Sequence, residues 1–345
     1  MTPFQPSDER SFSRRSLVSG ALGAAAFGMS AAAQGAPLTQ AGIMPKSVAQ
    51  STTDPSKRYP FKKSINLWAF PYPQKMSLEQ CLRLAKDAGF DGIELNYDLD
   101  NDLSPLHDAA HYATIRKLCA EIGLAVSGLC SFLFWPYPFT SHDAAKRARA
   151  LELAGLMAEC AHELETKNLL VVPGAVHIPW RDDYEPVAND VCDRRAREAV
   201  GKLLPRAEKL GVSLNIENIF FNGYLLTPGE MIAFVDSFQS KHVRVHFDTG
   251  NIMMFQFPEH WIAQLGGRIK NVHFKEFTKK GTDYSLETFR PLLDGTTNWP
   301  AVLEALAAHQ YEGYVTFEYF HPYAHWPEAL VYQTGDSLDR MLGRK

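Results

Sequence analysis

The chain has 345 residues, of which 46% are hydrophobic and 21% are charged. These values are typical of a globular protein and exclude a disordered, collagenous or disulfide-stapled chain. The formal net charge of -4 argues against a nucleic-acid partner, because proteins that bind phosphate backbones carry a basic surface. Length alone leaves open one domain or two, because a single α/β barrel commonly occupies about 250 residues.

The first 59 residues differ in composition from the rest. Arg14 and Arg15 precede an almost uncharged run of small residues at 17–33, a pattern typical of a twin-arginine export signal. We therefore expect residues 1–36 to be a cleaved signal and the protein to be periplasmic. The alternative is a retained membrane anchor, but the run is short and weakly apolar for a span. Residues 37–59 lack hydrophobic periodicity and are predicted to form a flexible linker.

No segment after residue 59 is long and apolar enough for a membrane span, so we expect none after processing. The five cysteines are odd in number, widely spaced and without a C-x-x-C pair, which favours structural thiols over disulfides or metal ligands. They are Cys81, Cys119, Cys130, Cys160 and Cys192.

From Ser64 onward, short apolar runs alternate with stretches of helical periodicity. Several runs are almost continuously apolar, as expected of parallel strands buried on both faces. The predicted strands are 64–69, 92–96, 125–130, 169–173, 213–217, 244–248, 269–274 and 314–318.

Local signals mark the ends of the helices between these strands. Two capping boxes predict helix starts, and three glycines before strands predict helix ends. These signals are Ser77 with Gln80, Thr227 with Glu230, and Gly89, Gly123 and Gly211. Eight strand–helix alternations predict a single (β/α)8 TIM barrel over residues 60–345, with an open doubly wound sheet as the alternative.

Four potential metal ligands end four successive predicted strands. In a barrel, these positions face a common mouth. A single Glu or His there is more often structural, but three carboxylates and an imidazole together would repel and resist desolvation without a cation. Oxygen ligands with one imidazole predict a divalent ion, with Mn²⁺ favoured over Co²⁺ or Mg²⁺, and the lack of Cys disfavours structural Zn²⁺. The ligands are Glu217, Asp248, His273 and Glu318, separated by 31, 25 and 45 residues.

A divalent ion that binds a substrate carbonyl and the neighbouring hydroxyl makes the adjacent C–H more acidic. Glu217 and Glu318 come from opposite strands and are predicted to be the acid/base pair, one removing the proton and the other returning it. Return to the opposite face of the same carbon is epimerisation, and return to the adjacent carbon is aldose–ketose isomerisation.

Several motifs resemble the xylose isomerase-like TIM-barrel superfamily, within its sugar (phosphate) isomerase/epimerase group. They include NLLVVPGAV, VHFDTGNIMMFQFPEHWI, RIKNVHFKEF and TFEYF. The nearest branch looks like the ribulose- and hexulose-phosphate 3-epimerases, with the D-tagatose 3-epimerase type as a cousin. The resemblance implies that Glu217 and Glu318 act both as metal ligands and as the acid/base pair, and that Asp248 and His273 complete the metal site.

Two positions depart from the tagatose type of this family. That type has His three residues after its metal-binding Asp, where this chain has Asn251, and Arg six residues after its metal-binding His, where this chain has Lys279. Other predicted substrate contacts end strands or follow His273, with ordinary packing or rim positions as the alternative. The full set is Asn251, Lys275, His177, Trp68, Glu94 and Lys279. His321, His325 and Trp326 are expected to lie in an aromatic lid or rim.

The predicted export signal conflicts with a phosphorylated substrate, because phosphosugars are cytoplasmic. We therefore expect an uncharged keto sugar or 3-keto-glycoside as substrate and no nucleic-acid partner. Alternatives are a lyase that eliminates the anomeric group of a 3-keto-glycoside, a non-catalytic sugar-binding barrel, and a metal-dependent endonuclease for abasic DNA. The endonuclease would need more His ligands at the strand ends than the chain shows. A homo-oligomer is compatible with the sequence.

Overall fold

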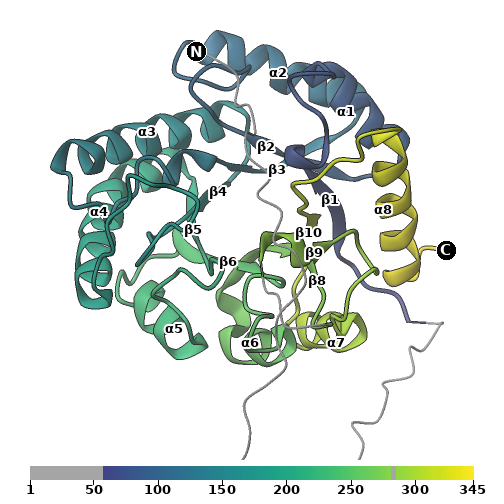
Figure 1. The fold of residues 1–345 in the computed structure, drawn as a ribbon. Coiled ribbons are helices and arrows are strands. Elements are labelled where there is room, and N and C mark those ends of the chain that lie inside the picture. The colour runs from purple at the N-terminus through teal and green to yellow at the C-terminus, as the bar shows by residue number, and fades with distance from the viewer. Residues whose placement is uncertain (1–56, 281–284) are drawn as a thin grey trace, which may run out of the picture. The chain divides into compact units, whose positions relative to one another are not determined.

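The structure is a computed structural model that describes residues 57–280 and 285–345. Eight parallel strands close into a barrel in the order β1-β10-β7-β6-β5-β4-β3-β2, with the helices outside them (Figure 1). The prediction of a single (β/α)8 TIM barrel is confirmed. The predictions of a signal at 1–36 and of a linker at 37–56 lie outside the described residues.

The observed strands differ from the predicted ones mainly at their ends. The predicted strand at 64–69 is wrong at its end, because the Asn66 side chain accepts a hydrogen bond from the Trp68 backbone N–H (2.8 Å) and starts the 3₁₀ turn Leu67–Ala69. The barrel strands are β1 Lys62–Asn66, β2 Gly92–Asn96, β3 Ala125–Cys130, β4 Asn168–Val171, β5 Ser213–Glu217, β6 Val243–Asp248, β7 Ile269–Phe274 and β10 Tyr314–Phe317.

Helix boundaries follow the local sequence signals. Both predicted capping boxes form, and the three glycines have φ values of 78°, 75° and 69°, so they close helices as expected. The helices are α1 Leu78–Asp87, α2 Ala109–Ile122, α3 Ala144–Glu163, α4 Asn189–Leu210, α5 Pro228–Asp236, α6 Pro258–Leu265, α7 Trp299–Ala308 and α8 Pro327–Met341. No described helix is long and apolar enough to cross a bilayer.

Short elements lie in the connections outside the barrel strands. In the long connection after β7, β8 Glu276–Phe277 pairs antiparallel with β9 Phe289–Arg290. Three further 3₁₀ turns are Phe132–Phe134, Gly266–Arg268 and Leu286–Thr288.

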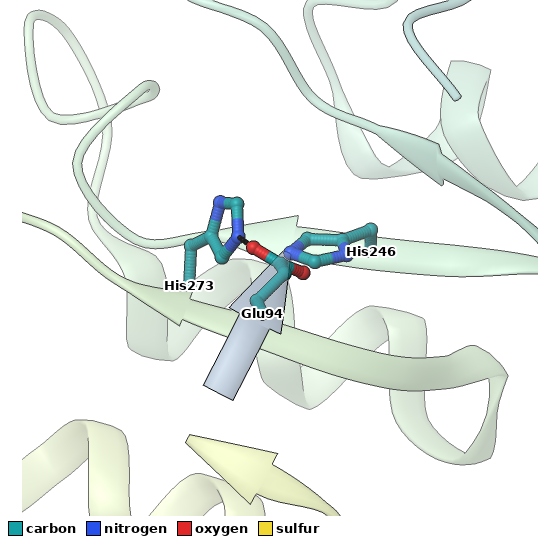
Figure 2. A group of neighbouring side chains, drawn as sticks. All are labelled: Glu94, His246 and His273. Carbon is teal, nitrogen blue, oxygen red and sulfur yellow. Dashed lines mark hydrogen bonds and ion pairs between the residues drawn. The ribbon is translucent and has the colours of Figure 1, made fainter. Parts of the chain in front are cut away.

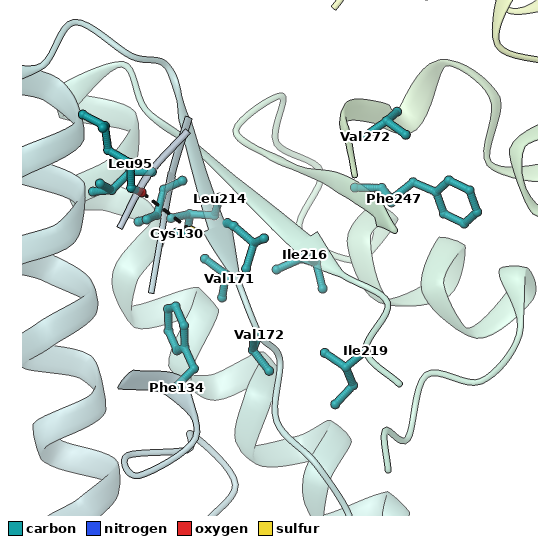
Figure 3. Close-up of a cluster of buried hydrophobic side chains, with 14 of the residues drawn as sticks. Leu95, Cys130, Phe134, Val171, Val172, Leu214, Ile216, Ile219, Phe247 and Val272 are labelled. Atoms are coloured by element: carbon teal, nitrogen blue, oxygen red, sulfur yellow. Dashed lines mark hydrogen bonds between the residues drawn. The ribbon is translucent and has the colours of Figure 1, made fainter. Parts of the chain in front are cut away.

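The apolar core lies between the strands and the surrounding helices. Outward-facing strand residues such as Ile216, Phe247 and Val272 are fully buried in it (Figure 3). Since strand side chains alternate, the residue after each of these, namely Glu217, Asp248 and His273, faces the barrel interior. β5, β6 and β7 are thus apolar on their outer face and polar on their inner face. Other buried polar side chains on inward-facing strand positions include Ser64, Glu94, Asn215, His246, Asn271 and Thr316.

The ends of the described barrel are joined by polar contacts. The Tyr59 backbone N–H donates to the Leu342 carbonyl (3.1 Å), and the Arg58 guanidinium donates to the Gly343 carbonyl. Residues 57–59, predicted to belong to the linker, are thus attached to the barrel. All five cysteines are free and buried, which confirms the prediction of structural thiols.

Candidate active site

Four predicted metal ligands converge at the carboxyl end of β5, β6, β7 and β10. One ligand atom from each of the four residues lies within 4.8 Å of the other three. His273 Nδ1 is 3.6 Å from a Glu217 oxygen, 3.7 Å from an Asp248 oxygen and 3.5 Å from a Glu318 oxygen. All four side chains are buried. These separations are too long for hydrogen bonds and suit ligands that share one cation.

Backbone amides orient the Asp248 carboxylate. Oδ1 accepts hydrogen bonds from the Gly250 and Asn251 N–H groups, both at 2.8 Å. Oδ2 accepts no hydrogen bond from the described residues and points toward His273 and Lys275. Asn218 joins the ends of β5 and β6, because its amide donates to the Asp248 carbonyl (2.8 Å) and accepts from the Asp248 N–H (2.9 Å). One oxygen of Asp248 is thus fixed and the other is left for a ligand.

Glu94 lies beneath His273 in the barrel interior (Figure 2). A Glu94 oxygen is 2.6 Å from His273 Nε2 and accepts a second hydrogen bond from the Asn66 amide (2.7 Å). An imidazole that donates from Nε2 presents Nδ1 as its lone-pair nitrogen, here toward the three carboxylates. Glu94 is not among the residues that line the cavity described below, and its substrate contact stays a prediction. Glu94 orients the ring of His273, which is a candidate metal ligand.

His246 is a buried histidine that the sequence interpretation missed. Its ring centroid is 4.0 Å from that of His273, and neither of its ring nitrogens has a hydrogen-bond partner among the described residues. Burial holds the His246 pKa well below its usual value, so the ring is neutral. A second group with spacing suited to a metal consists of Glu94, His246 and His273. Within this group, however, His273 Nε2 already bonds Glu94.

Burial and mutual repulsion set the protonation of the site carboxylates. Burial, followed by the charges of Asp248 and Glu217, raises the Glu318 pKa to about 7, although Lys275 and His273 oppose the shift. Burial also raises the Glu217 pKa. Burial would raise the Asp248 pKa too, but Lys275 and His273 outweigh it and lower that pKa. Without a cation, this cluster retains protons near neutral pH.

Lys275 supplies a positive charge beside the carboxylates. Its buried Nζ is 2.6 Å from Glu318 Oε2 and 3.5 Å from Asp248 Oδ2, and it donates to the Asn251 side-chain oxygen (3.2 Å). Burial alone would lower the Lys275 pKa, but the three acidic ligands raise it. The ammonium is therefore engaged by protein groups on one side.

The donor set fits a divalent cation. Asp248 Oδ2 and His273 Nδ1 are buried polar atoms without hydrogen-bond partners in the described chain, and such atoms are costly unless a ligand satisfies them. Three carboxylates and one imidazole are typical ligands of Mn²⁺ and related ions. Glu217, Asp248, His273 and Glu318 would hold the ion.

A cavity of about 240 Å³ opens above these ligands. Glu217 and Glu318 line it, and so do three of the predicted substrate contacts, Trp68, Asn251 and Lys275. Two predicted contacts lie elsewhere. His177 is exposed and packs edge-on to Tyr184, and Lys279 donates to the Gln256 carbonyl (3.0 Å) above the Phe257 ring. Neither side chain lines this cavity, and their sugar contacts stay predictions.

Sequence reasoning missed most of the aromatic lining of the cavity. Except for Phe289 in β9, these side chains come from loops and a 3₁₀ turn that follow barrel strands, where neither strand alternation nor helical periodicity marks direction. The only signal was composition, a high density of Phe and Trp in loops that follow strands. The missed lining residues are Phe132, Trp135, Trp180, Phe220, Phe289 and Phe320, and His321, expected in a lid or rim, also lines the cavity.

Four buried side chains able to bind a metal lie together at the carboxyl end of a (β/α)8 barrel. This combination of fold and site points to a class of TIM-barrel proteins. The family model for the xylose isomerase-like TIM barrel matches residues 82–340. The chain belongs to this family.

Curated relatives and solved structures agree with this assignment. L-ribulose-5-phosphate 3-epimerase UlaE of Shigella flexneri serotype 5b is 24% identical over 266 residues, covering 76% of this chain and 89% of that protein. L-ribulose 3-epimerase of Mesorhizobium japonicum is 26% identical over 253 residues, covering 70% and 75%. The solved D-allulose 3-epimerase of a Methylomonas species has a TM-score of 0.66 at 20% identity, covering 83% of this chain and 98% of that one. The structural likeness supports the fold.

Proposed function

We propose that this protein is a divalent-metal-dependent sugar epimerase or isomerase that moves a proton between Glu217, an uncharged keto substrate and Glu318. The observation that carries the proposal is the convergence of the four buried ligand atoms within 4.8 Å beneath a cavity lined by both glutamates. The sugar 3-epimerases among the relatives support the same class of reaction.

The two glutamates reach the cavity from different strands of the barrel. β5, which carries Glu217, and β10, which Glu318 directly follows, are separated in the barrel by β6 and β7. A bound divalent ion, with Mn²⁺ favoured, would polarise the substrate carbonyl and so acidify the neighbouring C–H. One glutamate removes that proton as a carboxylate, and the other returns a proton as a carboxylic acid. The raised pKa of Glu318, about 7, suits a group that changes protonation state near neutral pH.

The cavity supports an uncharged substrate. Among its described lining residues, Lys275 is the only Lys or Arg, and its ammonium already bonds Glu318 and Asn251. A phosphate group is normally held by several cationic or backbone donors. A keto sugar or 3-keto-glycoside is therefore the proposed substrate, and this agrees with the proposed export of the chain to the periplasm by its twin-arginine segment.

The test is proton exchange in D₂O. Metal-loaded protein is incubated with L-ribulose, D-fructose, D-tagatose and methyl 3-keto-β-D-glucopyranoside, and deuterium at the carbons next to the carbonyl is followed by NMR. We expect exchange with at least one substrate and a loss of at least about 100-fold in Glu217→Gln and in Glu318→Gln. Exposed Glu312→Gln is the matched control. Undiminished exchange in the Glu217→Gln, Glu318→Gln double variant would overturn the proposal.

The products identify the reaction. A change of configuration at the deuterated carbon is epimerisation, and movement of the carbonyl is isomerisation. Release of the anomeric group from a 3-keto-glycoside is elimination, which would make the protein a lyase with the same proton abstraction. N-terminal sequencing of protein from the periplasmic fraction tests export and cleavage near residue 36, and native mass spectrometry tests for a homo-oligomer.

A further inference from the structure

Five aromatic side chains form a continuous series along the cavity, which we call the aromatic arc: Phe320, Trp68, Phe132, Trp135 and Trp180. Successive ring centroids are 5.2, 6.3, 6.4 and 5.0 Å apart. The residues come from the segments that follow β10, β1, β3 and β4, so four separate connections contribute to one surface. Such convergence in a cavity is a feature of ligand sites.

The arc extends from the candidate metal centre to solvent. At its inner end, the Phe320 ring centroid is 4.5 Å from Lys275 Nζ, which itself lies 2.6 Å from Glu318. Toward the rim, Phe132 is 46% exposed and Trp180 is 38% exposed. Large exposed aromatic side chains grouped in a concave surface mark a binding site more often than a folding requirement. The outer rings are therefore available to a part of the substrate that lies beyond the reacting carbons.

Cations beside the arc are engaged in ion pairs within the protein. A neighbouring hollow that shares Trp135 contains Lys146 and Arg181, but both bond Asp183, at 2.9 and 3.0 Å. The outer cavity therefore offers flat apolar faces rather than free cations. Aromatic faces favour flat ring partners with an apolar side.

We propose that the aromatic arc binds a second ring joined to the keto sugar, so that the substrates are uncharged two-ring glycosides rather than single sugars or sugar phosphates. The inference rests on the proposed function, because the keto ring occupies the metal end of the same cavity. The second ring is a pyranose or an aryl group. Both present the flat, weakly polar face that the tryptophans accept.

The test compares three uncharged probes that differ only in their second group: the methyl, phenyl and β-glucosyl 3-keto-β-D-glucopyranosides. Binding to the unmodified protein freed of metal by a chelator is measured by calorimetry, so that turnover does not interfere. We expect the phenyl or the glucosyl probe to bind about tenfold more tightly than the methyl probe, equivalent to about 1.4 kcal/mol. The comparison of phenyl with glucosyl distinguishes an aryl from a sugar occupant.

Variants of the aromatic arc test whether its side chains cause the tighter binding of the two-ring probes. Trp180→Ala and Phe132→Ala change exposed side chains and so leave the core intact. Each should remove most of the tenfold difference in affinity between the two-ring probes and the methyl probe, and leave the affinity for the methyl probe unchanged. Trp326→Ala is the matched control, since Trp326 is 75% exposed and does not line the cavity. Circular dichroism and the melting temperature verify folding of each variant.

Two outcomes overturn the inference: equal binding of the three probes, or tighter binding of L-ribulose 5-phosphate than of L-ribulose. Either would leave the proton-transfer proposal standing if deuterium exchange occurs in the unmodified protein. Conversely, absence of exchange from a two-ring probe that binds through Trp180 would overturn the proposed function and leave the subsite in place.

Discussion

At the scale of single residues, the most informative contact is that between Glu94 and His273. It is buried, 2.6 Å long, and joins a side chain of β2 to one of β7 across the barrel interior. Burial would raise the Glu94 pKa, but the charge and hydrogen bond of the facing His273, with the hydrogen bond from the Asn66 amide, lower it to about 2. Glu94 is thus ionised at neutral pH and acts as a positioning residue for a ligand.

Removal of the Glu94 carboxylate should weaken metal binding. We expect Glu94→Ala to lower Mn²⁺ affinity by about 10- to 100-fold, because His273 loses the partner that directs Nδ1 toward the site. Glu94→Gln, which can still accept a hydrogen bond from Nε2, should lose less. Calorimetric titration of the metal-free proteins measures both affinities. An unchanged affinity in Glu94→Ala would show that packing alone orients the ring.

Metal affinity should depend on pH because protons compete for the same atoms. The Glu318 carboxyl, with a pKa raised to about 7, is protonated below that pH, and the charges of Glu94 and Glu318 hold the His273 pKa well above its usual value despite burial. Mn²⁺ needs both groups deprotonated, so its affinity should fall as pH decreases from 8 to 6. Titration in buffers of different ionisation enthalpy should also detect proton release. Constant affinity across this range would contradict the assignment.

At the scale of elements, the long connection after β7 is organised around one buried carboxylate. Glu276 accepts hydrogen bonds from the Trp299 indole (2.6 Å) and from the backbone N–H groups of Leu293 and Thr297 (both 3.1 Å). A Cβ on Gly295 would lie 2.3 Å from a Glu276 oxygen, so the turn fits closely around the carboxylate. The same connection carries Phe289, which lines the cavity.

Loss of this carboxylate should destabilise the fold. Glu276→Ala leaves several buried donors without an acceptor, and we expect a decrease of about 2–3 kcal/mol in the free energy of unfolding. Exposed Glu287→Ala, in the same connection, is the control and should change it by less than about 0.5 kcal/mol. Urea denaturation measures both. A decrease in Glu276→Ala no larger than in the control would mean that water replaces the carboxylate.

Elements with strong local signals were predictable from the sequence, and residues directed by tertiary contacts were not. The metal ligands follow from their positions on strands, where alternation fixes direction, as for Glu217 after Ile216. Glu94 also occupies an inward strand position, but its depth in the barrel depends on the stagger of neighbouring strands. Trp135 and Trp180 come together only because two loops meet, with ring centroids 5.0 Å apart. No local pattern in the sequence encodes that distance.

At the scale of the whole molecule, the four proposed metal ligands lie in or directly after four separate strands, so metal binding should stabilise the complete barrel. At a free Mn²⁺ concentration 100 times the dissociation constant, the expected stabilisation is about 2.7 kcal/mol, enough to raise the melting temperature by about 5 °C. Scanning calorimetry with Mn²⁺ and with a chelator measures the shift. The Asp248→Asn, Glu217→Gln double variant should show none, and an equal shift there would place the ion elsewhere.

Along each of these strands, outward-facing residues stabilise the fold and inward-facing residues determine the chemistry of the site. In β5, Leu214 and Ile216 face the helices, while Asn215 and Glu217 face the interior. Truncation of Ile216 to Ala would remove core packing worth about 2–5 kcal/mol, whereas changes at the inward positions alter chiefly the chemistry above them. Catalytic diversification can therefore proceed on every second residue of a strand while the fold is inherited through the residues between them.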